Sequence, residues 1–201
     1  EPSFALLFLV AGAVAWQRRA TSHTGPPLGL SAALWALGSY GPTGIEPVWA
    51  LGFAFEGYYD VSLALLALTF PADSLVARAR VVWTVLLGAF LVRSASRLLF
   101  SDPPRTYPEL FPDGPTNPFA IFESRAAFEA VEVTTSVVVL VCVVLVAVLA
   151  TRRLLRSRAL TRAVVGPVLV ASVIAMGFAA VEAFDTAWSN AFGVSLLVVS
   201  P

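Results

Sequence analysis

The sequence contains no lysine, and all 13 of its basic residues are arginine. A retinal protein needs a lysine amine for its Schiff base, so this chain cannot supply the retinal site of a rhodopsin-like protein. The single histidine, His23, lies among Thr, Gly and Pro residues, and we interpret it as a loop residue. Cys142 is the one cysteine, which excludes an internal disulfide and gives no basis for a metal site. We expect it to be a small apolar residue that faces lipid.

Charge is scarce as well. Charged residues make up 13% of the chain and hydrophobic residues 58%, and the mean hydropathy is +0.81. Soluble domains carry roughly 25% charged residues, so this chain has too little charge to cover its surface in water. Lipid is therefore the expected solvent, and we expect no nucleic-acid partner. The sequence also has no Gly-rich phosphate loop, HExxH, GxSxG or Ser/His/Asp arrangement, and so we expect no catalytic residue and no cofactor in this chain.

Apolar segments alternate with Arg-rich or Pro/Gly-rich breaks along the chain. This pattern predicts an all-α, polytopic membrane helix bundle, a single domain over 1–201 with about seven transmembrane segments. The chain ends at Pro201 inside an apolar run, and we expect the first and last helices to be truncated parts of longer ones. The predicted segments are 3–16, 27–40, 46–70, 81–100, 128–150, 163–184 and 191–201.

The distribution of arginine predicts the orientation in the membrane. Arginine clusters follow the first, third and fifth segments, so one topology places all of them in the cytoplasm. That side would hold nine arginines against Asp73 alone, and the opposite side with the outer helix halves four against twelve acids. Residues 101–127, rich in proline and aromatic residues, would then form a compact extracytoplasmic loop with one surface helix over 120–130. We expect a multi-pass protein of a bacterial plasma membrane.

Ionisable residues inside membrane spans are energetically costly and are therefore candidates for function. Glu56 and Asp60 are four residues apart in the third segment, and Arg93 and Arg97 are four apart in the fourth. Each pair shares one face of its helix. Opposite charges at similar depth on consecutive antiparallel helices predict pairing, with Glu56 and Arg93 the best matched. Two interpretations stay open: a buried ion-pair network that fixes helix register, and a polar sensing pocket that opens outward.

A second acidic group is predicted near the outer ends of the fifth and sixth segments. It consists of two pairs spaced three residues apart: Glu129 with Glu132, and Glu182 with Asp185. Such a group could bind a cation, but we favour carboxylates that are solvated at the level of the lipid headgroups. With no histidine among them we expect no transition-metal site, whereas Ca²⁺ or Mg²⁺ with oxygen ligands stays open.

Three stretches at the predicted cytoplasmic connections carry a family resemblance: AWQRR at 15–19 leading to Thr24-Gly25, LTFP at 68–71 continuing to Leu75 and Arg78, and SRALTRAVVGPVL at 157–169. In order and spacing they resemble the N-terminal membrane sensor region of actinobacterial two-component sensor histidine kinases, whose partners are NarL-type response regulators. The arginine-only composition is typical of a GC-rich bacterium.

The resemblance implies a sensor and signal-transmission region that is not itself catalytic. It also implies a kinase core after Pro201, which would bind ATP and Mg²⁺, carry the phosphoacceptor histidine, form a homodimer and contact the response regulator. An alternative of another class is a small transporter or permease-like subunit that uses the buried charges as a substrate pathway. A structural membrane subunit without a ligand is the third alternative.

Overall fold

The computed structural model describes 25–38, 45–69, 75–106, 113–156 and isolated positions at 10, 13, 17 and between 170 and 188. All regular secondary structure among these residues is helical, which confirms the all-α part of the prediction for them. The helices are α2 (Gly25–Gly38), α3 (Glu46–Phe55), α4 (Tyr59–Thr69), α5 (Ala77–Phe100), α6 (Pro103–Thr106) and α7 (Arg125–Arg156).

Three helical stretches are long and apolar enough to cross a membrane. They are Glu46–Thr69 and Ala77–Phe100, with 24 residues each, and Arg125–Arg156, with 32 residues. A membrane span needs about 20 residues, and α2 with its 14 residues is shorter than this. The larger number of about seven spans stays a prediction, since the predicted segments 3–16, 163–184 and 191–201 lie wholly or largely outside the described residues.

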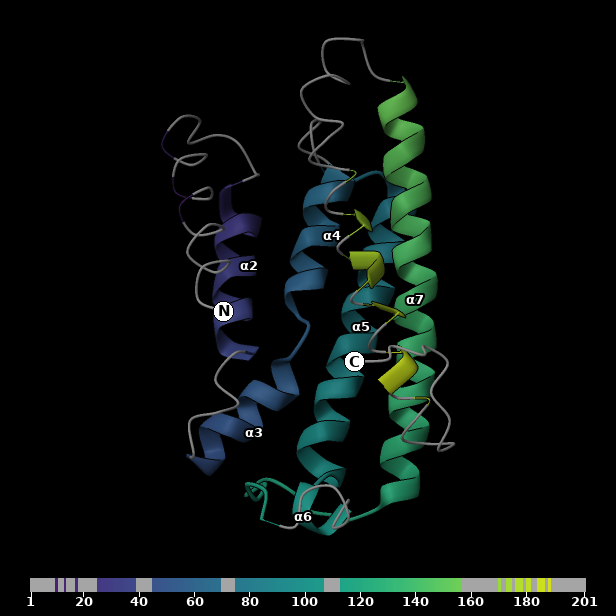
Figure 1. The fold of residues 1–201 in the computed structure, drawn as a ribbon. Coiled ribbons are helices and arrows are strands. Elements are labelled where there is room, and N and C mark those ends of the chain that lie inside the picture. Colours follow the sequence, from purple (N-terminus) through teal and green to yellow (C-terminus); the bar gives the residue numbers. More distant parts are fainter. Residues whose placement is uncertain are drawn as a thin grey trace, which may run out of the picture.

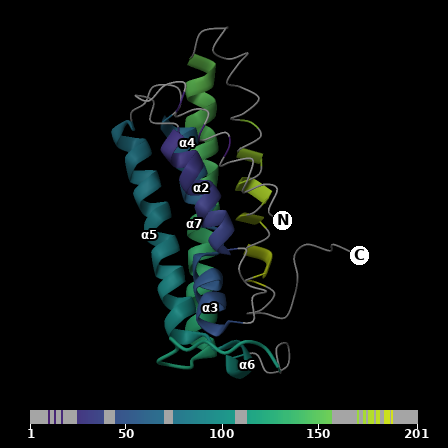
Figure 2. The same cartoon turned by 90° about the vertical axis from the view of Figure 1, so that its left-hand side faces the viewer.

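Helices α5 and α7 lie side by side and run antiparallel, and they form the longest part of the bundle (Figures 1 and 2). The side of α7 that faces the bundle buries Val139, Cys142 and Val146. Its opposite side exposes Val141 and Val144, among other valines. A helix that is apolar on all sides is typical of a membrane span, because lipid can cover the outer side. The prediction that Cys142 faces lipid is wrong, because this thiol is only 3% exposed and packs in the core.

The predicted single helix over 46–70 is interrupted at Glu56, Gly57 and Tyr58, where α3 ends and α4 begins at a different angle (Figure 1). Gly57 has a φ of +83°, a left-handed conformation that residues with a Cβ rarely adopt. Across the break, the Tyr58 amide donates to the Phe55 carbonyl at 3.2 Å, and the Asp60 amide donates to the Gly57 carbonyl at 2.9 Å. The chain therefore bends sharply within one apolar stretch.

Helix α4 is fixed on two sides by polar contacts. Its Ser62 hydroxyl lies 2.6 Å from the Ser31 hydroxyl of α2. On the other side, the indole nitrogen of Trp83 on α5 donates to the Val61 carbonyl at 3.1 Å. Because few polar partners exist in an apolar bundle, such contacts fix the relative positions of α2, α4 and α5.

The loop between α5 and α7 is organised by Asn117. Its side-chain amide nitrogen lies 3.1 and 3.0 Å from the carbonyl oxygens of Arg97 and Leu98 in the last turn of α5, and 2.7 Å from that of Ser101 directly after it. Its backbone amide donates to a carboxylate oxygen of Asp102 at 2.9 Å. The predicted surface helix over 120–130 is wrong, since residues 120–124 are not helical and 125–130 belong to the long helix α7.

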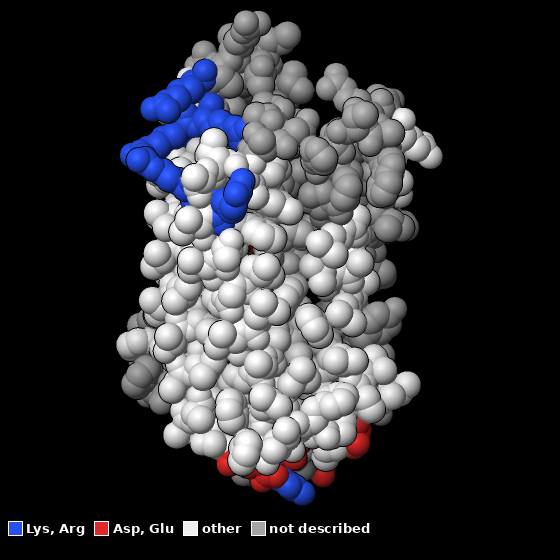
Figure 3. Space-filling view, turned by 180° about the vertical axis from the view of Figure 1, so that it is seen from behind, with Lys and Arg blue, Asp and Glu red and all other residues white. Residues whose placement is uncertain are grey.

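Charge is divided between the two ends of the bundle, with an uncharged band between them (Figure 3). On the face that this view shows, arginine side chains gather at one end and acidic side chains lie at the other, which we call the acidic end. The members of the basic end are Arg78, Arg80, Arg152, Arg153 and Arg156. This separation agrees with the arginine asymmetry of the sequence, whereas the side of the membrane that each end faces stays a prediction.

Gly57→Ala tests the helix break. The new methyl group would meet the ring of Phe90 at 3.1 Å in a strained left-handed conformation, so we expect a loss of about 1–2 kcal/mol of stability. The matched control is Gly88→Ala in α5, where no heavy atom lies within 4 Å and alanine favours the helix. Thermal unfolding in detergent micelles, followed by circular dichroism, measures both. Equal melting temperatures for the two variants would contradict the described break.

Candidate functional site

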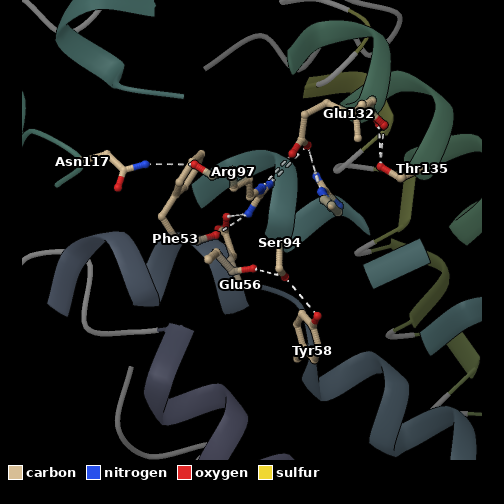
Figure 4. A network of polar contacts seen from close by, with 11 residues as sticks. Phe53, Glu56, Tyr58, Ser94, Arg97, Asn117, Glu132 and Thr135 are labelled. Carbon is tan, nitrogen blue, oxygen red and sulfur yellow. Dashed lines mark hydrogen bonds and ion pairs between the residues drawn. The ribbon is translucent and has the colours of Figure 1, made fainter. Parts of the chain in front are cut away.

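Two arginines of α5 share one carboxylate of α7 (Figure 4). Arg93 donates from Nε to Oε2 of Glu132 at 2.8 Å, and its Nη2 lies 2.7 Å from the same oxygen. Arg97 donates from Nε to Oε1 at 2.8 Å and from Nη2 to Oε2 at 3.3 Å. All three side chains are at most 9% exposed. Glu132 is thus bound by two guanidinium groups inside the bundle, and such two-pronged charged hydrogen bonds are among the stronger ones.

The geometry of the two helices explains why these residues meet. Arg93 and Arg97 are one turn apart on α5 and therefore project from the same face. Arg93 lies seven residues before the end of α5, and Glu132 lies seven residues after the start of α7. At 1.5 Å per residue, both are roughly 10 Å from the same end of an antiparallel pair. Equal depth on facing helices brings the opposite charges together.

Arg97 also binds the end of α3. Its Nη1 donates to the Phe53 carbonyl at 2.7 Å and to Oε2 of Glu56 at 3.0 Å. The guanidinium carbon lies 4.5 Å from the centre of the Phe53 ring, a cation–π arrangement. The carboxyl end of a helix carries a partial negative charge, and its last carbonyls lack partners within the helix, so a buried arginine is well placed there.

Ser94 supplies a second partner for the interrupted helix. Its hydroxyl donates to the Ala54 carbonyl at 2.6 Å and lies 3.0 Å from the Tyr58 hydroxyl. The consecutive carbonyl groups of Phe53 and Ala54 thus both accept hydrogen bonds from side chains of α5. A helix can end inside an apolar bundle only when its last carbonyls find such partners. Ser94 and Arg97 fulfil this requirement.

A cavity of about 260 Å³ opens beside the break. The four ionisable residues singled out in the sequence, Glu56, Asp60, Arg93 and Arg97, all line it. Asp60 is 4% exposed, and within the described part of the chain its Oδ1 has no hydrogen-bond partner. Arg97 pairs with both Glu56 and Glu132, and Arg93 pairs with Glu132, so no ion pair within the described structure includes Asp60. The cavity therefore presents a buried acceptor to whatever occupies it.

The structure pairs these charges differently from the sequence-based expectation. Glu56 contacts Arg97 and not Arg93, and its side chain is 63% exposed. Asp60 forms no ion pair with either arginine in the described structure. The chief partner of both arginines is Glu132, and the expectation that this residue is solvated at the headgroup level is wrong. The equal depth of Arg93 and Glu132 on neighbouring helices was the sequence signal that could have revealed this pair.

Of the other members of the outer acidic group, the structure describes one ion pair, that of Glu129. Glu129 pairs with Arg125, one turn away on α7, at 2.8 Å near the exposed end of the helix. Asp185 is described only as an isolated position, and Glu182, like His23, lies outside the described residues. No set of three or more His, Cys, Asp or Glu side chains in the described ranges is arranged to hold a metal ion. Ser94, Tyr58 and Asn117 are parts of the polar network that the sequence did not single out.

Glu132→Gln tests the shared carboxylate. The amide would leave the buried Arg93 without its ion-pair partner and Arg97 with only the mostly exposed Glu56, and we expect a loss of about 3–5 kcal/mol of stability. Glu56→Gln removes a mostly exposed partner and should lose about 1 kcal/mol or less, and Glu129→Gln should lose no more than that. Thermal unfolding in micelles, followed by circular dichroism, ranks the stabilities of the three variants. We expect the melting temperature of Glu132→Gln to fall by on the order of 10 °C. An equal effect of Glu132→Gln and Glu129→Gln would contradict the described cluster.

Comparisons with protein-family models, with curated proteins and with solved structures find no match to this chain. The resemblance to sensor kinases therefore stays a prediction from the three sequence stretches, of which 157–169 lies outside the described residues. What can be said of function rests on the membrane-spanning helices and on the charged cluster at the helix break.

Proposed function

We propose that this chain is the membrane sensor and signal-transmission region of a two-component histidine kinase, and that it is not itself catalytic. It would lie in a bacterial plasma membrane as a multi-pass bundle of about seven spans. The observation that best supports this proposal is the cavity at the break between α3 and α4, lined by Glu56, Asp60, Arg93 and Arg97. A buried, unpaired acceptor beside a hinge-like break is the kind of site where a bound ligand can change a helix arrangement.

The proposed signal begins at Arg97, which joins three helices. This residue binds Glu132 of α7 and, through Nη1, both the Phe53 carbonyl and Glu56 at the end of α3. A ligand that engages Glu56 competes with the contact between Arg97 and Glu56 and so loosens α3 from α5, and Asp60 offers that ligand a second acceptor in the same cavity. The two angles of α3 relative to α4, pivoting at Gly57, are the two states of the switch.

The kinase core belongs to the longer protein that we propose. It would follow Pro201, carry the phosphoacceptor histidine, bind ATP and Mg²⁺, and contact a NarL-type response regulator. Homodimerisation through that core would couple two copies of the bundle. Helices α5 and α7 are the elements of this chain that run from the charged cluster to the basic end, and they are the proposed route of the signal.

A transporter or permease-like subunit is the second candidate, and the break between α3 and α4 favours it. Many secondary transporters bind substrate where a membrane helix is interrupted, because the freed backbone groups and nearby charges line the site. Here the freed carbonyls are those of Phe53 and Ala54, and both are occupied by side chains of α5. A pathway through the cavity would require these contacts to open.

Asp60→Asn in the complete parent protein separates the two candidates. In proteoliposomes supplied with Mg-ATP, a sensor kinase incorporates phosphate into its own histidine, and we expect Asp60→Asn to change this rate severalfold by biasing the switch. The matched control, Asp113→Asn, alters an exposed loop residue and should leave the rate unchanged. A parent protein that shows no ATP-dependent phosphorylation refutes the kinase proposal, and solute uptake that Asp60→Asn abolishes supports the transporter.

The proposed orientation has its own test. In a Cys142→Ala background, a membrane-impermeant maleimide added outside whole cells should label Thr116→Cys and leave Ser157→Cys unlabelled. The reason is that Thr116 lies in the loop at the acidic end, whereas Ser157 directly follows the arginines at the end of α7. Labelling after cell lysis serves as the control that both thiols react. The reverse pattern would overturn the orientation and, with it, a cytoplasmic kinase core.

A further inference from the structure

A second hollow, of about 510 Å³, lies at the basic end, between the end of α4, the start of α5 and the end of α7. Apolar side chains, including Leu68 and Leu149, line part of it. The remainder is formed by arginine side chains of two helices, namely Arg78, Arg152, Arg153 and Arg156. The hollow therefore combines an apolar wall with several arginine side chains at the basic end of the bundle.

These arginines differ in what they bind. Arg153 is half-buried and donates from Nη1 to the Leu68 carbonyl at the end of α4, so its role is structural. Arg78, Arg152 and Arg156 are exposed, and no carboxylate of the described residues lies within ion-pair distance of them. Like charges repel when they gather around one hollow, and a bound anion removes that repulsion.

The general enrichment of arginine next to membrane spans explains why this end is basic. It does not explain why four arginines of two helices line the same hollow. Arg80, two residues beyond Arg78 on α5, is also exposed and does not line the hollow. A comparison of Arg78 with Arg80 therefore distinguishes the general positive charge of this end from the arrangement of arginines around the hollow. Only Arg78 contributes to the arrangement from α5.

We propose that this hollow binds the phosphate of an anionic phospholipid, with the headgroup among Arg78, Arg152 and Arg156 and an acyl chain along the neighbouring apolar surface. Guanidinium groups match the oxygens of a phosphate with paired hydrogen bonds. Val76, which lines the hollow, is 66% exposed and offers apolar surface to a lipid chain. Basic pockets between membrane helices are suited to anionic headgroups for the same reasons. The inference requires only that the bundle lies in a membrane, and it is independent of the sensor proposal.

Native mass spectrometry of the protein in detergent micelles tests this site. The protein is titrated with an equimolar mixture of dioleoyl phosphatidylglycerol and dioleoyl phosphatidylcholine, which share their acyl chains and differ in headgroup charge. We expect the wild type to retain phosphatidylglycerol preferentially. Each arginine near an anionic headgroup contributes about fivefold to binding, so the triple variant Arg78→Gln, Arg152→Gln and Arg156→Gln should lose on the order of hundredfold. The matched control Arg80→Gln should keep the wild-type preference.

The remaining outcomes also decide the proposal. Equal retention of the two lipids by the wild type, or equal losses in Arg80→Gln and the triple variant, would overturn the site. Displacement of phosphatidylglycerol by millimolar inorganic phosphate would identify a site for free phosphate and refute the lipid. Circular dichroism reports whether the triple variant folds. If it does not, Arg78→Gln alone, compared with Arg80→Gln, gives the test with an expected loss of about fivefold.

Discussion

The carboxylate of Glu132, held between the guanidiniums of Arg93 and Arg97, is the interaction on which the described bundle depends. An apolar bundle offers few partners to a charged side chain, and an unpaired one is strongly disfavoured there. The three residues therefore have one arrangement that satisfies them all, and this arrangement fixes the rotation and the relative height of α5 and α7. The apolar side chains that pack between these helices fill the space, whereas the shared carboxylate specifies the register.

The interruption between α3 and α4 depends on the same cluster. A helix that stops inside an apolar bundle leaves carbonyl groups without partners, and those of Phe53 and Ala54 accept hydrogen bonds from Arg97 and Ser94. Gly57 provides the left-handed turn that changes the direction of the chain. Because Arg97 serves both Glu132 and Phe53, the break and the contact between α5 and α7 form one cooperative unit. Asp60, at the start of α4, is left facing the cavity with an acceptor that this unit does not satisfy.

Composition and periodicity were sufficient to predict the helical class, the long apolar helices α5 and α7 and the ionisable residues that line the cavity. They did not predict the break at Gly57, because a glycine within an apolar run is also compatible with a continuous helix. They also assigned Glu132 to the solvated edge, since the sequence shows how deep a residue lies but not which way its helix is rotated. The helix rotation, which decides whether Glu132 faces Arg93 or the headgroups, follows from packing against α5. The contacts of Asn117 in the loop depend on backbone carbonyls, and no residue pattern reveals those.

Coupling between the three charged residues is the most direct test of this account. Unfolding free energies in micelles are compared for Glu132→Leu, for the double variant Arg93→Leu and Arg97→Leu, and for the triple variant that combines them. If the carboxylate is shared as described, Glu132→Leu leaves the buried Arg93 without its ion-pair partner and Arg97 with only the mostly exposed Glu56. The triple variant, which removes both cations as well, should then be more stable than Glu132→Leu alone. A triple variant whose loss equals the sum of the losses of the other two would show that the residues act independently, and it would contradict the account.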